Sequence, residues 1–523
     1  MIDLSRFATY ESARADFVWP TPTQFNIADV CATRFAIAAP DRAALIVADG
    51  AGAPQTITYR ALDLMANRCA NALTAKGVGR GTMVGVHLGQ RLETVVVHLA
   101  IYKIGAIAVP LAAVFGPDAI AYRVTHAGIA LLVTAEDGVA KAQGSGAALL
   151  DADRDLPDLM ARAADTFEAA RTGPDDPAMM IFTSGTTGQP KGALHGHRVL
   201  LGHLPGVQMH HDLMPHPGDR LWTPADWAWA GGLLNVLLPG LAMGVPVVAQ
   251  RAKKFDPEEA LDWAAAAGVR NAFIPPTALR MMREVRPRAA LRSVASGGEQ
   301  LGAATFEWGR AALGLTINEF YGQTEANIVL SSCAAWGVAT PGVIGRPVPG
   351  HGVAIVDAAG TPVPDGTQGT IAVRRPDPVM FLGYHANAAA TAEKFAGEYL
   401  LSGDQGVAEP DGIRFIGRDD DVISSAGYRI GPGEIESCLA GHPAVALAAV
   451  VGAPDAVRGE VVHAFIKLAP GHTAGDTLVD DIKSFVRQRL SAHEYPRAVT
   501  FVEDVPLTTT GKVIRRGFRD QVR

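Results

Sequence analysis

The sequence predicts an α/β fold with two domains. The large N-terminal domain is expected to contain two αβαβα-type sheet subdomains and a small β-rich subdomain, and a small α+β C-terminal domain follows. Three observations support this prediction. A chain of 523 residues is too long for a single hydrophobic core. Apolar runs of strand length alternate with helical patterns up to Asn318. Glycine and proline are dense from Pro341 to Gly350, which indicates many turns.

The first part of the chain shows helical and strand-like patterns in alternation. Helices are expected at residues 26–38, 59–76, 93–104 and 120–127, and strands at 45–48, 55–58, 83–88, 106–110 and 131–134. Strands that alternate with helices of this length indicate parallel sheets covered on both faces. The Ala-, Asp- and Gly-rich stretch 140–177 is expected to lie at the surface.

The rest of the chain continues this pattern with shorter elements. Strands are expected at 178–182, 246–249, 271–274, 291–299 and 315–318, and a helix at 257–267. The uncharged stretch 228–250 is interrupted by glycines and prolines, so a buried helix, a turn and a strand explain it better than a membrane span. Strand-like runs at 370–373, 379–384 and 400–401 predict the β-rich subdomain. The last part predicts helices at 434–439 and 477–489 and strands at 444–451, 461–467 and 501–502.

Composition narrows the classes of function. With 48% hydrophobic and 19% charged residues, the chain is expected to be globular and soluble. A formal net charge of -7 gives no general attraction to nucleic acid or to an anionic membrane, so neither is an expected partner. The four cysteines lack Cys-x-x-Cys spacing, which argues against a zinc site or a disulfide framework. The N-terminus shows no secretory signal, so a cytoplasmic location is the default expectation.

The segment Thr183–Gly192 has the composition of a phosphate-holding loop. It reads Thr-Ser-Gly-Thr-Thr-Gly-Gln-Pro-Lys-Gly and follows a strand-like run. Glycines let backbone N–H groups turn toward an anion, and hydroxyl groups and a lysine add donors and positive charge. It differs from the P-loop of nucleotide triphosphatases, because Lys191 lies between Pro190 and Gly192 and is not followed by Ser or Thr.

Two further segments suit an organic ligand. Residues 319–325, Glu-Phe-Tyr-Gly-Gln-Thr-Glu, present an aromatic ring, hydrogen-bond donors and a carboxylate together. That combination suits a purine, phosphate oxygens and Mg²⁺. Residues 226–232, Asp-Trp-Ala-Trp-Ala-Gly-Gly, place two indoles before two glycines. Indoles give a rigid wall for a ligand, although plain core tryptophans are the alternative.

Six histidines follow the phosphate-loop segment. They are His195, His197, His203, His210, His211 and His216. No accompanying pattern of Asp, Glu or Cys supports a metal site, so we expect solvated or locally hydrogen-bonded histidines. His195, directly after the loop, is a candidate neighbour of a bound nucleotide.

Two motifs mark the C-terminal part. Residues 416–431 contain three consecutive aspartates after Arg418. These charges repel one another and are expected to be solvated, as in a linker between domains. The closing segment Pro506–Arg516 carries Gly-Lys within a hydroxyl-rich loop, which on its own reads as a flexible tail.

These motifs, in this order from about Thr183 to Arg516, resemble those of the adenylate-forming (ANL) superfamily of acyl-CoA synthetases, adenylation domains and luciferases. The chain is especially similar to short- and medium-chain acyl-CoA synthetases. The resemblance implies an adenylation domain over residues 1–417, a hinge over 418–421 and a mobile C-terminal domain over 422–523. It also implies two half-reactions. A carboxylate attacks the α-phosphate of ATP·Mg²⁺, giving an acyl adenylate and pyrophosphate, and the thiol of coenzyme A then displaces AMP.

The resemblance assigns residues to the first half-reaction. Those that would hold the β- and γ-phosphates are Thr183, Ser184, Gly185, Thr186, Thr187, Gly188 and Lys191. Those of the adenine site are Gly298, Glu299, Gln300, Glu319, Phe320 and Tyr321, with Gly322 and Gln323 in the same motif. Glu325 would bind Mg²⁺ and Thr324 the α-phosphate. Asp404, assisted by Arg418, would accept from the ribose hydroxyls, and Arg429 would contact phosphate. Lys512 would bridge the carboxylate and the α-phosphate.

The second half-reaction requires the C-terminal domain to rotate. By resemblance, Asp420 occupies the hinge position. The pantetheine tunnel would be lined by Ala426, Gly427 and Tyr428. Arg458 and Arg487 match basic positions that hold the phosphates of coenzyme A.

The acyl site differs from that of acetyl-specific relatives. Trp229 takes the aromatic position of the acyl-pocket motif, but Gly322 stands where those relatives carry a tryptophan. The missing indole predicts room for methylenes, each worth about 0.8 kcal/mol when buried. A medium-chain or aromatic carboxylic acid is therefore the expected substrate, as in fatty acid metabolism. The alternatives are a stand-alone adenylation enzyme that loads a carrier protein in trans, a luciferase-type monooxygenase and a non-enzymatic nucleotide-binding protein.

Overall fold

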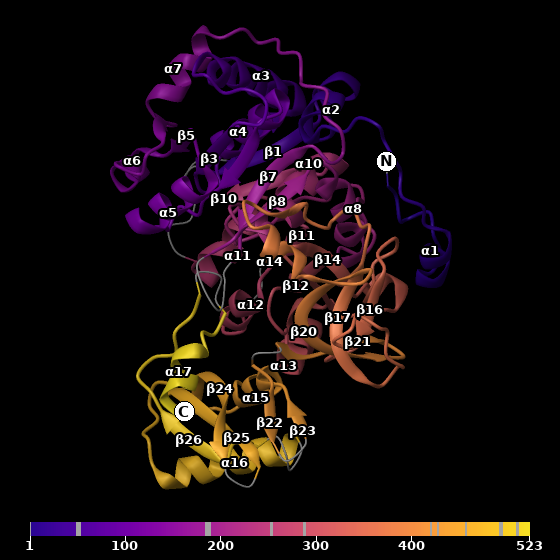
Figure 1. Cartoon of the computed structure of the whole chain (residues 1–523), viewed down its shortest axis with the longest axis vertical. Helices are drawn as coiled ribbons and strands as arrows, with labels where there is room; N and C mark the ends of the chain where they lie inside the picture. The colour runs from indigo at the N-terminus through magenta and orange to yellow at the C-terminus, as the bar shows by residue number, and fades with distance from the viewer. Residues whose placement is uncertain are drawn as a thin grey trace.

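The structure is a computed structural model that describes most of the chain. The described residues are 2–48, 54–183, 190–250, 255–285, 289–418, 421–425, 428–455, 458–490, 495–508 and 512–522. Within these ranges the strands form four sheets. Figure 1 shows the three sheets of the N-terminal part together, with the fourth sheet and its helices at one end of the molecule.

The first sheet has seven strands, in the order β18-β8-β7-β4-β3-β5-β6. Its strands are β3 (Met83–His87), β4 (Ile107–Pro110), β5 (Leu131–Thr134), β6 (Ala148–Asp151), β7 (Pro177–Phe182), β8 (Gly192–Gly196) and β18 (Gly383–Tyr384). Strands β3 to β7 run parallel, and β8 and β18 pair antiparallel at one edge. All four residues of β4 and of β5 are buried, as expected for strands covered on both faces.

The second sheet has nine strands, in the order β15-β14-β13-β12-β11-β9-β10-β1-β2. Its strands are β1 (Ala43–Ala48), β2 (Gln55–Thr58), β9 (Leu221–Trp222), β10 (Val247–Gln250), β11 (Asn271–Phe273), β12 (Ser293–Gly297), β13 (Ile317–Gln323), β14 (Ala326–Ser331) and β15 (Arg346–Pro347). One large hydrophobic core contains residues of both sheets, among them Val84, Leu131, Val247 and Phe320.

Helices accompany these two sheets, and their ends follow sequence signals. They are α1 (Tyr10–Asp16), α2 (Arg34–Ala38), α3 (Tyr59–Ala75), α4 (Leu92–Ile104), α5 (Pro117–Ala127), α6 (Glu136–Ala142), α7 (Asp155–Arg162), α8 (Arg198–His210), α9 (Ala230–Gly232), α10 (Leu238–Met243), α11 (Pro257–Ala266), α12 (Pro276–Met282) and α13 (Ala303–Trp308). Helix α5 begins with Pro117 and ends at Gly128, whose φ of 64° gives a left-handed cap.

The third sheet forms the β-rich subdomain, as predicted. Its strands are β16 (Val353–Val356), β17 (Gln368–Arg374), β19 (Phe395–Ala396), β20 (Tyr399–Glu409) and β21 (Gly412–Arg418), with the short helix α14 (Ala388–Ala392). Its core includes Ala193 of the first sheet and Leu330 of the second. The three sheets therefore share packed side chains.

The fourth sheet is separate from the others. It contains β22 (Ile423–Ser425), β23 (Tyr428–Ile430), β24 (Val445–Asp455), β25 (Gly459–Leu468) and β26 (Ala498–Phe501), with α15 (Pro432–Leu439), α16 (Asp476–Arg489) and α17 (Arg516–Val522). Its two hydrophobic cores contain only residues from Ile423 onward. The predicted fold class, with a small α+β part after the large one, is confirmed.

Three expectations need correction. The stretch 140–177 does not lie wholly at the surface, because it contains β6, whose Leu150 and Asp151 are buried where they pair with β5. The strand expected at 315–318 continues further, because β13 spans Ile317–Gln323 and residues 319–323 therefore form its end. Within 379–384 only Gly383–Tyr384 is a strand, and it pairs with β8 of the first sheet, outside the β-rich subdomain.

The uncharged stretch 228–250 folds as predicted. It forms helical turns from Ala230 to Met243, a left-handed cap at Gly244 and strand β10. Across the described ranges, no helix combines the length and the apolar character needed to cross a membrane.

Candidate active site

The end of β13 and the strand β20 bring together three residues of the predicted nucleotide site. The hydroxyl of Tyr321 and the amide of Gln323 both donate to Oδ2 of Asp404, each at 2.6 Å. Gln323 also donates to the carbonyl of Ser402 at 2.8 Å. Burial, together with the neighbouring Asp404 carboxylate, raises the pKa of Tyr321 well above its usual value. Asp404 is thus a buried carboxylate in a fixed orientation, paired in register with Arg418 on β21.

Glu325 lies in the turn after β13, where Tyr384 contacts it. The hydroxyl of Tyr384 donates a short hydrogen bond to Oε1 of this buried carboxylate. The ammonium of Lys191 lies over the ring of Tyr384, 5.1 Å from its centroid. Tyr384 therefore connects the lysine of the phosphate-loop segment to the acid predicted to bind Mg²⁺.

The phosphate-loop segment is described only at its two ends. The N–H of Thr183 donates to the carbonyl of Lys191 at 2.9 Å, where the strands β7 and β8 meet. Tyr122 on α5 donates to the carbonyl of Pro190 at 2.9 Å. Its other predicted phosphate ligands lie outside the described residues: Ser184, Gly185, Thr186, Thr187 and Gly188.

The predicted adenine site follows β12. Gly298 has a φ of 95°, a backbone conformation that favours glycine in this turn. The carboxylate of Glu299 accepts from Thr277 Oγ1 at 3.0 Å and from Arg280 Nη2 at 2.7 Å. Gln300 packs against α15 of the fourth sheet, since a Cβ added to Gly433 would lie 2.4 Å from its Oε1.

Two further residues of this predicted site are held by packing. Phe320 is buried between the rings of Phe273 and His210, at centroid distances of 5.3 and 4.7 Å. Glu319 accepts a hydrogen bond from the N–H of Leu301 at 3.2 Å. Burial raises the pKa of Glu319 to about 7, although the Leu301 N–H opposes this effect.

Lys512 reaches the same site from the fourth-sheet part of the chain. The residue is exposed on its loop, and partial desolvation by the surrounding protein lowers its pKa below the usual 10.5. Asp404, Glu299 and Glu325 oppose the shift, whereas Arg418 adds to it. A cation and these three acids therefore interact across the boundary between the two parts.

The two predicted acyl-site residues, Trp229 and Gly322, come from different sequence motifs and have different surroundings. Trp229 is half-buried and meets Phe115 edge to face at 5.8 Å. The Asp226 carboxylate accepts from the N–H of Ala228 at 3.0 Å and fixes this turn. A Cβ added to Gly322 would lie 2.3 Å from the backbone nitrogen of Ile328, so β14 passes directly beside this glycine.

The structure leaves the coenzyme A assignments untested. Asp420, Ala426 and Gly427 lie outside the described residues, as do the side chains of Tyr428 and Arg429. Arg458 is half-buried in the turn before β25, where its N–H donates to Asp455 at 2.8 Å. Arg487 is exposed on α16 and lies over the ring of Tyr495 at 5.6 Å. Thr324 is half-buried between Gln323 and Glu325.

The histidine expectation is corrected in part. Five of the six are buried, and only His216 is exposed, so they are not solvated. Local hydrogen bonds are found, for example between His203 Nδ1 and the Val199 carbonyl at 2.6 Å. Burial lowers the pKa of His195 to about 3, so this neighbour of the Thr324 backbone is a neutral imidazole. In the part of the chain that the structure describes, no group of three or more His, Cys, Asp or Glu residues could hold a metal.

Sequence reasoning missed Tyr384 and the pair Thr277 and Arg280. Tyr384 lies in strand β18, which reaches the site by pairing with β8, and its partner Ala193 is far away in the chain. Thr277 and Arg280 lie on α12 and act through Glu299. Neither set carries a local motif, because each is defined by a contact between distant segments.

An adenylate-forming enzyme is expected to have large α/β sheets and a nucleotide motif at the end of a strand, with a lysine that reaches this motif from a separate small domain. The end of β13 and Lys512 correspond to these parts. The comparisons agree. The family model of the AMP-binding enzyme matches residues 33–385, and that of the AMP-binding enzyme C-terminal domain matches residues 434–512. The chain belongs to the AMP-binding enzyme family, and within it to the acyl-coenzyme A synthetases, which are AMP-forming acid–thiol ligases.

Individual relatives cover nearly the whole chain. Human mitochondrial acyl-coenzyme A synthetase ACSM4 is 32% identical over 515 residues, which is 92% of this chain and 87% of the relative. An acyl-CoA synthetase of Brucella canis is 33% identical, with a TM-score of 0.76 over 98% of this chain and 99% of its own. A benzoate CoA ligase of Burkholderia xenovorans LB400 is 28% identical, with a TM-score of 0.83 over 95% of this chain and 100% of its own.

Proposed function

We propose that this protein is an ATP-dependent acyl-CoA synthetase that activates a medium-chain fatty or aromatic carboxylic acid through an acyl adenylate. One observation carries the proposal most directly. Lys512, from the C-terminal part, interacts with Asp404, Glu299 and Glu325 of the nucleotide site. The relatives named above support the reaction, since they include acyl-coenzyme A synthetases and a benzoate CoA ligase.

In the first half-reaction the site must bring two anions together. Lys512 supplies a positive charge between the acid's carboxylate and the α-phosphate, where negative charge builds up. Asp404, oriented by Tyr321 and Gln323, accepts from the ribose hydroxyls. Thr183 and Lys191, with the loop between them, hold the departing pyrophosphate, and Thr324 donates to the α-phosphate. Gly298, Glu299, Gln300 and Glu319 surround the adenine.

Magnesium fits the residues present. Mg²⁺ commonly takes one or two carboxylates and fills its other positions with water and nucleotide phosphates. Glu325 is one such carboxylate, buried beside the phosphate-loop segment and oriented by the Tyr384 hydroxyl. When bound, the ion would neutralise part of the phosphate charge.

For the second half-reaction we propose that residues 1–417 and 422–523 are two domains joined by a hinge at 418–421. Rotation about Asp420 would withdraw Lys512 and admit the thiol. Ala426, Gly427 and Tyr428 would line the pantetheine tunnel, Arg429 would contact phosphate, and Arg458 and Arg487 would hold the phosphates of coenzyme A. The separate cores on the two sides of this hinge support the proposal.

The size of the acid depends on Trp229 and on the chain near Gly322. Because a Cβ added to Gly322 would lie 2.3 Å from β14, the glycine acts by admitting the backbone of Ile328. The backbone of β14 therefore fills the space beside Gly322, and the missing indole does not itself leave room for methylenes as the sequence had suggested. Solved relatives include a benzoate CoA ligase and an anthranilate CoA ligase in complex with anthranoyl-AMP, which supports an aromatic or similarly extended acid.

The test separates the two half-reactions. Pyrophosphate release is measured with ATP and each of acetate, hexanoate, octanoate and benzoate, without coenzyme A, and thioester formation is then measured with it. We expect pyrophosphate without coenzyme A, a thioester with it, and a higher kcat/KM for one of the longer acids than for acetate. Adenylation without any thioester would favour loading of a carrier protein. A preference for acetate would contradict the substrate proposal.

A further inference from the structure

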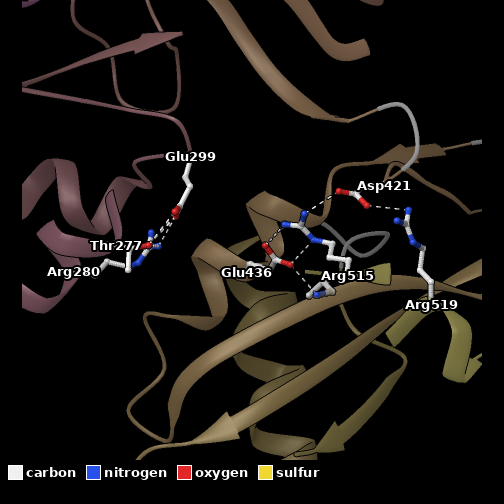
Figure 2. A network of polar contacts seen from close by, with 8 residues as sticks. Thr277, Arg280, Glu299, Asp421, Glu436, Arg515 and Arg519 are labelled. Carbon is white, nitrogen blue, oxygen red and sulfur yellow. Dashed lines mark hydrogen bonds and ion pairs between the residues drawn. The ribbon is translucent and has the colours of Figure 1, made fainter. Parts of the chain in front are cut away.

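A cluster of ionic side chains lies between the proposed hinge and the arm that carries Lys512. Arg515 donates from Nε to Glu436 Oε1 at 2.8 Å, from Nη2 to Glu436 Oε2 at 2.5 Å and from Nη1 to Asp421 Oδ2 at 2.9 Å. Arg519 pairs with the other oxygen of Asp421 at 2.9 Å. We call these four residues the Arg515 cluster, and Figure 2 shows them beside the Glu299 site of the N-terminal part.

The Arg515 cluster is built for a fixed geometry. Arg515 is 18% exposed, Glu436 14% and Asp421 9%, so solvent screens these pairs weakly. The planar guanidinium binds Glu436 through two parallel hydrogen bonds and Asp421 through a third, a pattern that lysine cannot reproduce. The two carboxylates raise the pKa of Arg515, although burial opposes them, so the guanidinium stays charged.

Glu436 anchors the Arg515 cluster in the C-terminal core. Its Oε1 also accepts the N–H of Val450 on β24 at 2.8 Å. Burial raises the pKa of Glu436, and Arg515 opposes this effect. The cluster is therefore attached at one side to β24, the strand at one end of the order of the fourth sheet.

The other side of the Arg515 cluster leads to Lys512 along a short hairpin. Leu507 and Val513 form an antiparallel bridge. The N–H of Thr508 donates to the carbonyl of Lys512 at 2.7 Å, and the N–H of Lys512 donates back to Thr508 Oγ1 at 3.0 Å. Arg515 follows Lys512 by three residues on the second arm, so fixing its guanidinium fixes the base of the hairpin.

Asp421 connects this arm to the hinge. It is the last residue of the segment about which the C-terminal domain is proposed to rotate, and each of its two carboxylate oxygens pairs with an arginine of the closing segment. We infer that Arg515 is a positioning residue for Lys512: it joins Asp421, the last residue of the proposed hinge, to the Lys512 hairpin. The two segments then move as one body, and Lys512 is placed correctly at the nucleotide site. This inference rests on the proposed function of Lys512.

The test compares the two half-reactions in Arg515→Ala. A small misplacement of a catalytic group costs up to about 100-fold, so we expect the single-turnover rate of adenylation to fall about 10-fold or more. The KM for ATP should change by no more than about two-fold, because the nucleotide-binding side chains of the N-terminal part are untouched. Thioester formation from supplied acyl adenylate and coenzyme A should stay within about three-fold of the parent, because that step does not use Lys512.

Three further variants control this experiment. Lys467→Ala removes an ion pair of the same domain that is exposed, with Lys467 at 43% and Asp504 at 75%, and should leave both half-reactions unchanged. Arg515→Lys keeps the positive charge but loses the paired guanidinium hydrogen bonds. Its adenylation rate should therefore be intermediate between those of the parent and Arg515→Ala. Glu436→Gln leaves the pair between Arg515 and Asp421 in place, so its adenylation rate should fall by less than that of Arg515→Ala while thioester formation is retained. If Arg515→Ala does not fold, this variant still tests the inference.

The possible outcomes are distinguishable. An equal loss of both half-reactions, or no loss in either, would overturn the inference and leave Arg515 a structural residue. A parent enzyme that releases no pyrophosphate with any acid would instead overturn the proposed function itself.

Discussion

The charge on Lys512 depends on the residues around it. Burial lowers its pKa below 10.5, and Glu299 is one of the acids that oppose this shift. In the proposed mechanism adenylation needs the protonated form of Lys512, so its rate should fall as pH rises through the lowered pKa. Glu299→Gln removes an opposing charge, so the alkaline limb should move to lower pH. The measurement is kcat/KM for ATP from about pH 7 to about pH 10.

An exposed acid provides the control for this pH profile. Glu398, 67% exposed beside the third sheet, should leave the alkaline limb in place when changed to glutamine. If the alkaline limb of the pH profile of Glu299→Gln is unchanged, or moves to higher pH, the carboxylate of Glu299 does not raise the pKa of Lys512.

Glu319 makes a separate prediction about stability. Its folded-state pKa is raised from 4.5 to about 7, so the folded protein holds a proton that the unfolded chain releases between these values. Stability is therefore lost as pH rises through that window. At about pH 8, Glu319→Gln should have a free energy of unfolding higher than that of the parent by on the order of 1–2 kcal/mol, and therefore a higher unfolding temperature. At about pH 5 the two proteins should differ little. Calorimetry at the two pH values checks this, and a gain that is equal at both would contradict it.

Among the elements, α8 shows how glycines bring helix and strand into contact. A Cβ at Gly206 would lie 2.3 Å from the Ile328 side chain, and one at Gly202 would lie 2.5 Å from Val379. Ile328 has a φ of 50°, a left-handed conformation that is strained for a β-branched residue. It is held on one side by α8 and on the other by the chain at Gly322.

Gly206→Ala should therefore destabilise the protein although alanine favours helices. The gain in helix propensity is about 1 kcal/mol, but overpacking against Ile328 costs about 1–3 kcal/mol. Gly517→Ala in α17 is the matched control, because nothing lies within 4 Å of its added Cβ, and it should be neutral or stabilising. Unfolding by heat compares the two variants. If Gly206→Ala unfolds at a higher temperature than the parent, β14 can shift away from the added methyl group with little loss of stability.

Many of the helices and strands could be predicted from the sequence, but their long-range pairing could not. Short-range patterns predicted the bounds of α3, β4, α11 and most strands within a few residues. A helix or strand that is buried on one face or on both shows a regular repeat or run of apolar residues in the sequence. Sequence motifs predicted Tyr321, Gln323 and Asp404 as residues of one nucleotide site, and the structure brings their side chains into hydrogen-bond contact. What could not be predicted depends on distant pairing, such as β18 with β8, which brings Tyr384 to Glu325. The left-handed Ile328 beside Gly322 is likewise invisible in a linear pattern.

At the scale of the whole molecule, no hydrophobic core of the described residues has buried members on both sides of residues 418–421. Four cores contain residues no later than Ile413 among their buried members, and two contain residues from Ile423 onward. Polar and close contacts such as Gln300 with Gly433 and Gly302 with Ser437 touch across the boundary. A fragment of residues 1–417 should therefore fold by itself.

That fragment should bind ATP and yet fail to adenylate. It keeps Asp404, Tyr321, Gln323 and Glu325 but lacks Lys512, so its pyrophosphate release should fall to the level of full-length Lys512→Ala. Calorimetric titration with ATP and a pyrophosphate assay give the two readouts, and the full-length chain is the control. A fragment that still adenylates at the parent rate would remove Lys512 from the mechanism.

The separation of the cores also bears on how such an enzyme changes over generations. In the proposed acyl site, Trp229 packs against a core that, among the described residues, shares no buried apolar side chain with the part that carries Lys512. Mutations selected in one part therefore seldom need compensation in the other, and recombination between relatives near residue 418 can exchange whole halves without breaking a core. The substrate of this lineage can therefore change while the part that carries Lys512 is inherited unchanged, as long as the N-terminal part keeps Asp404, Glu299 and Glu325, which interact with that lysine.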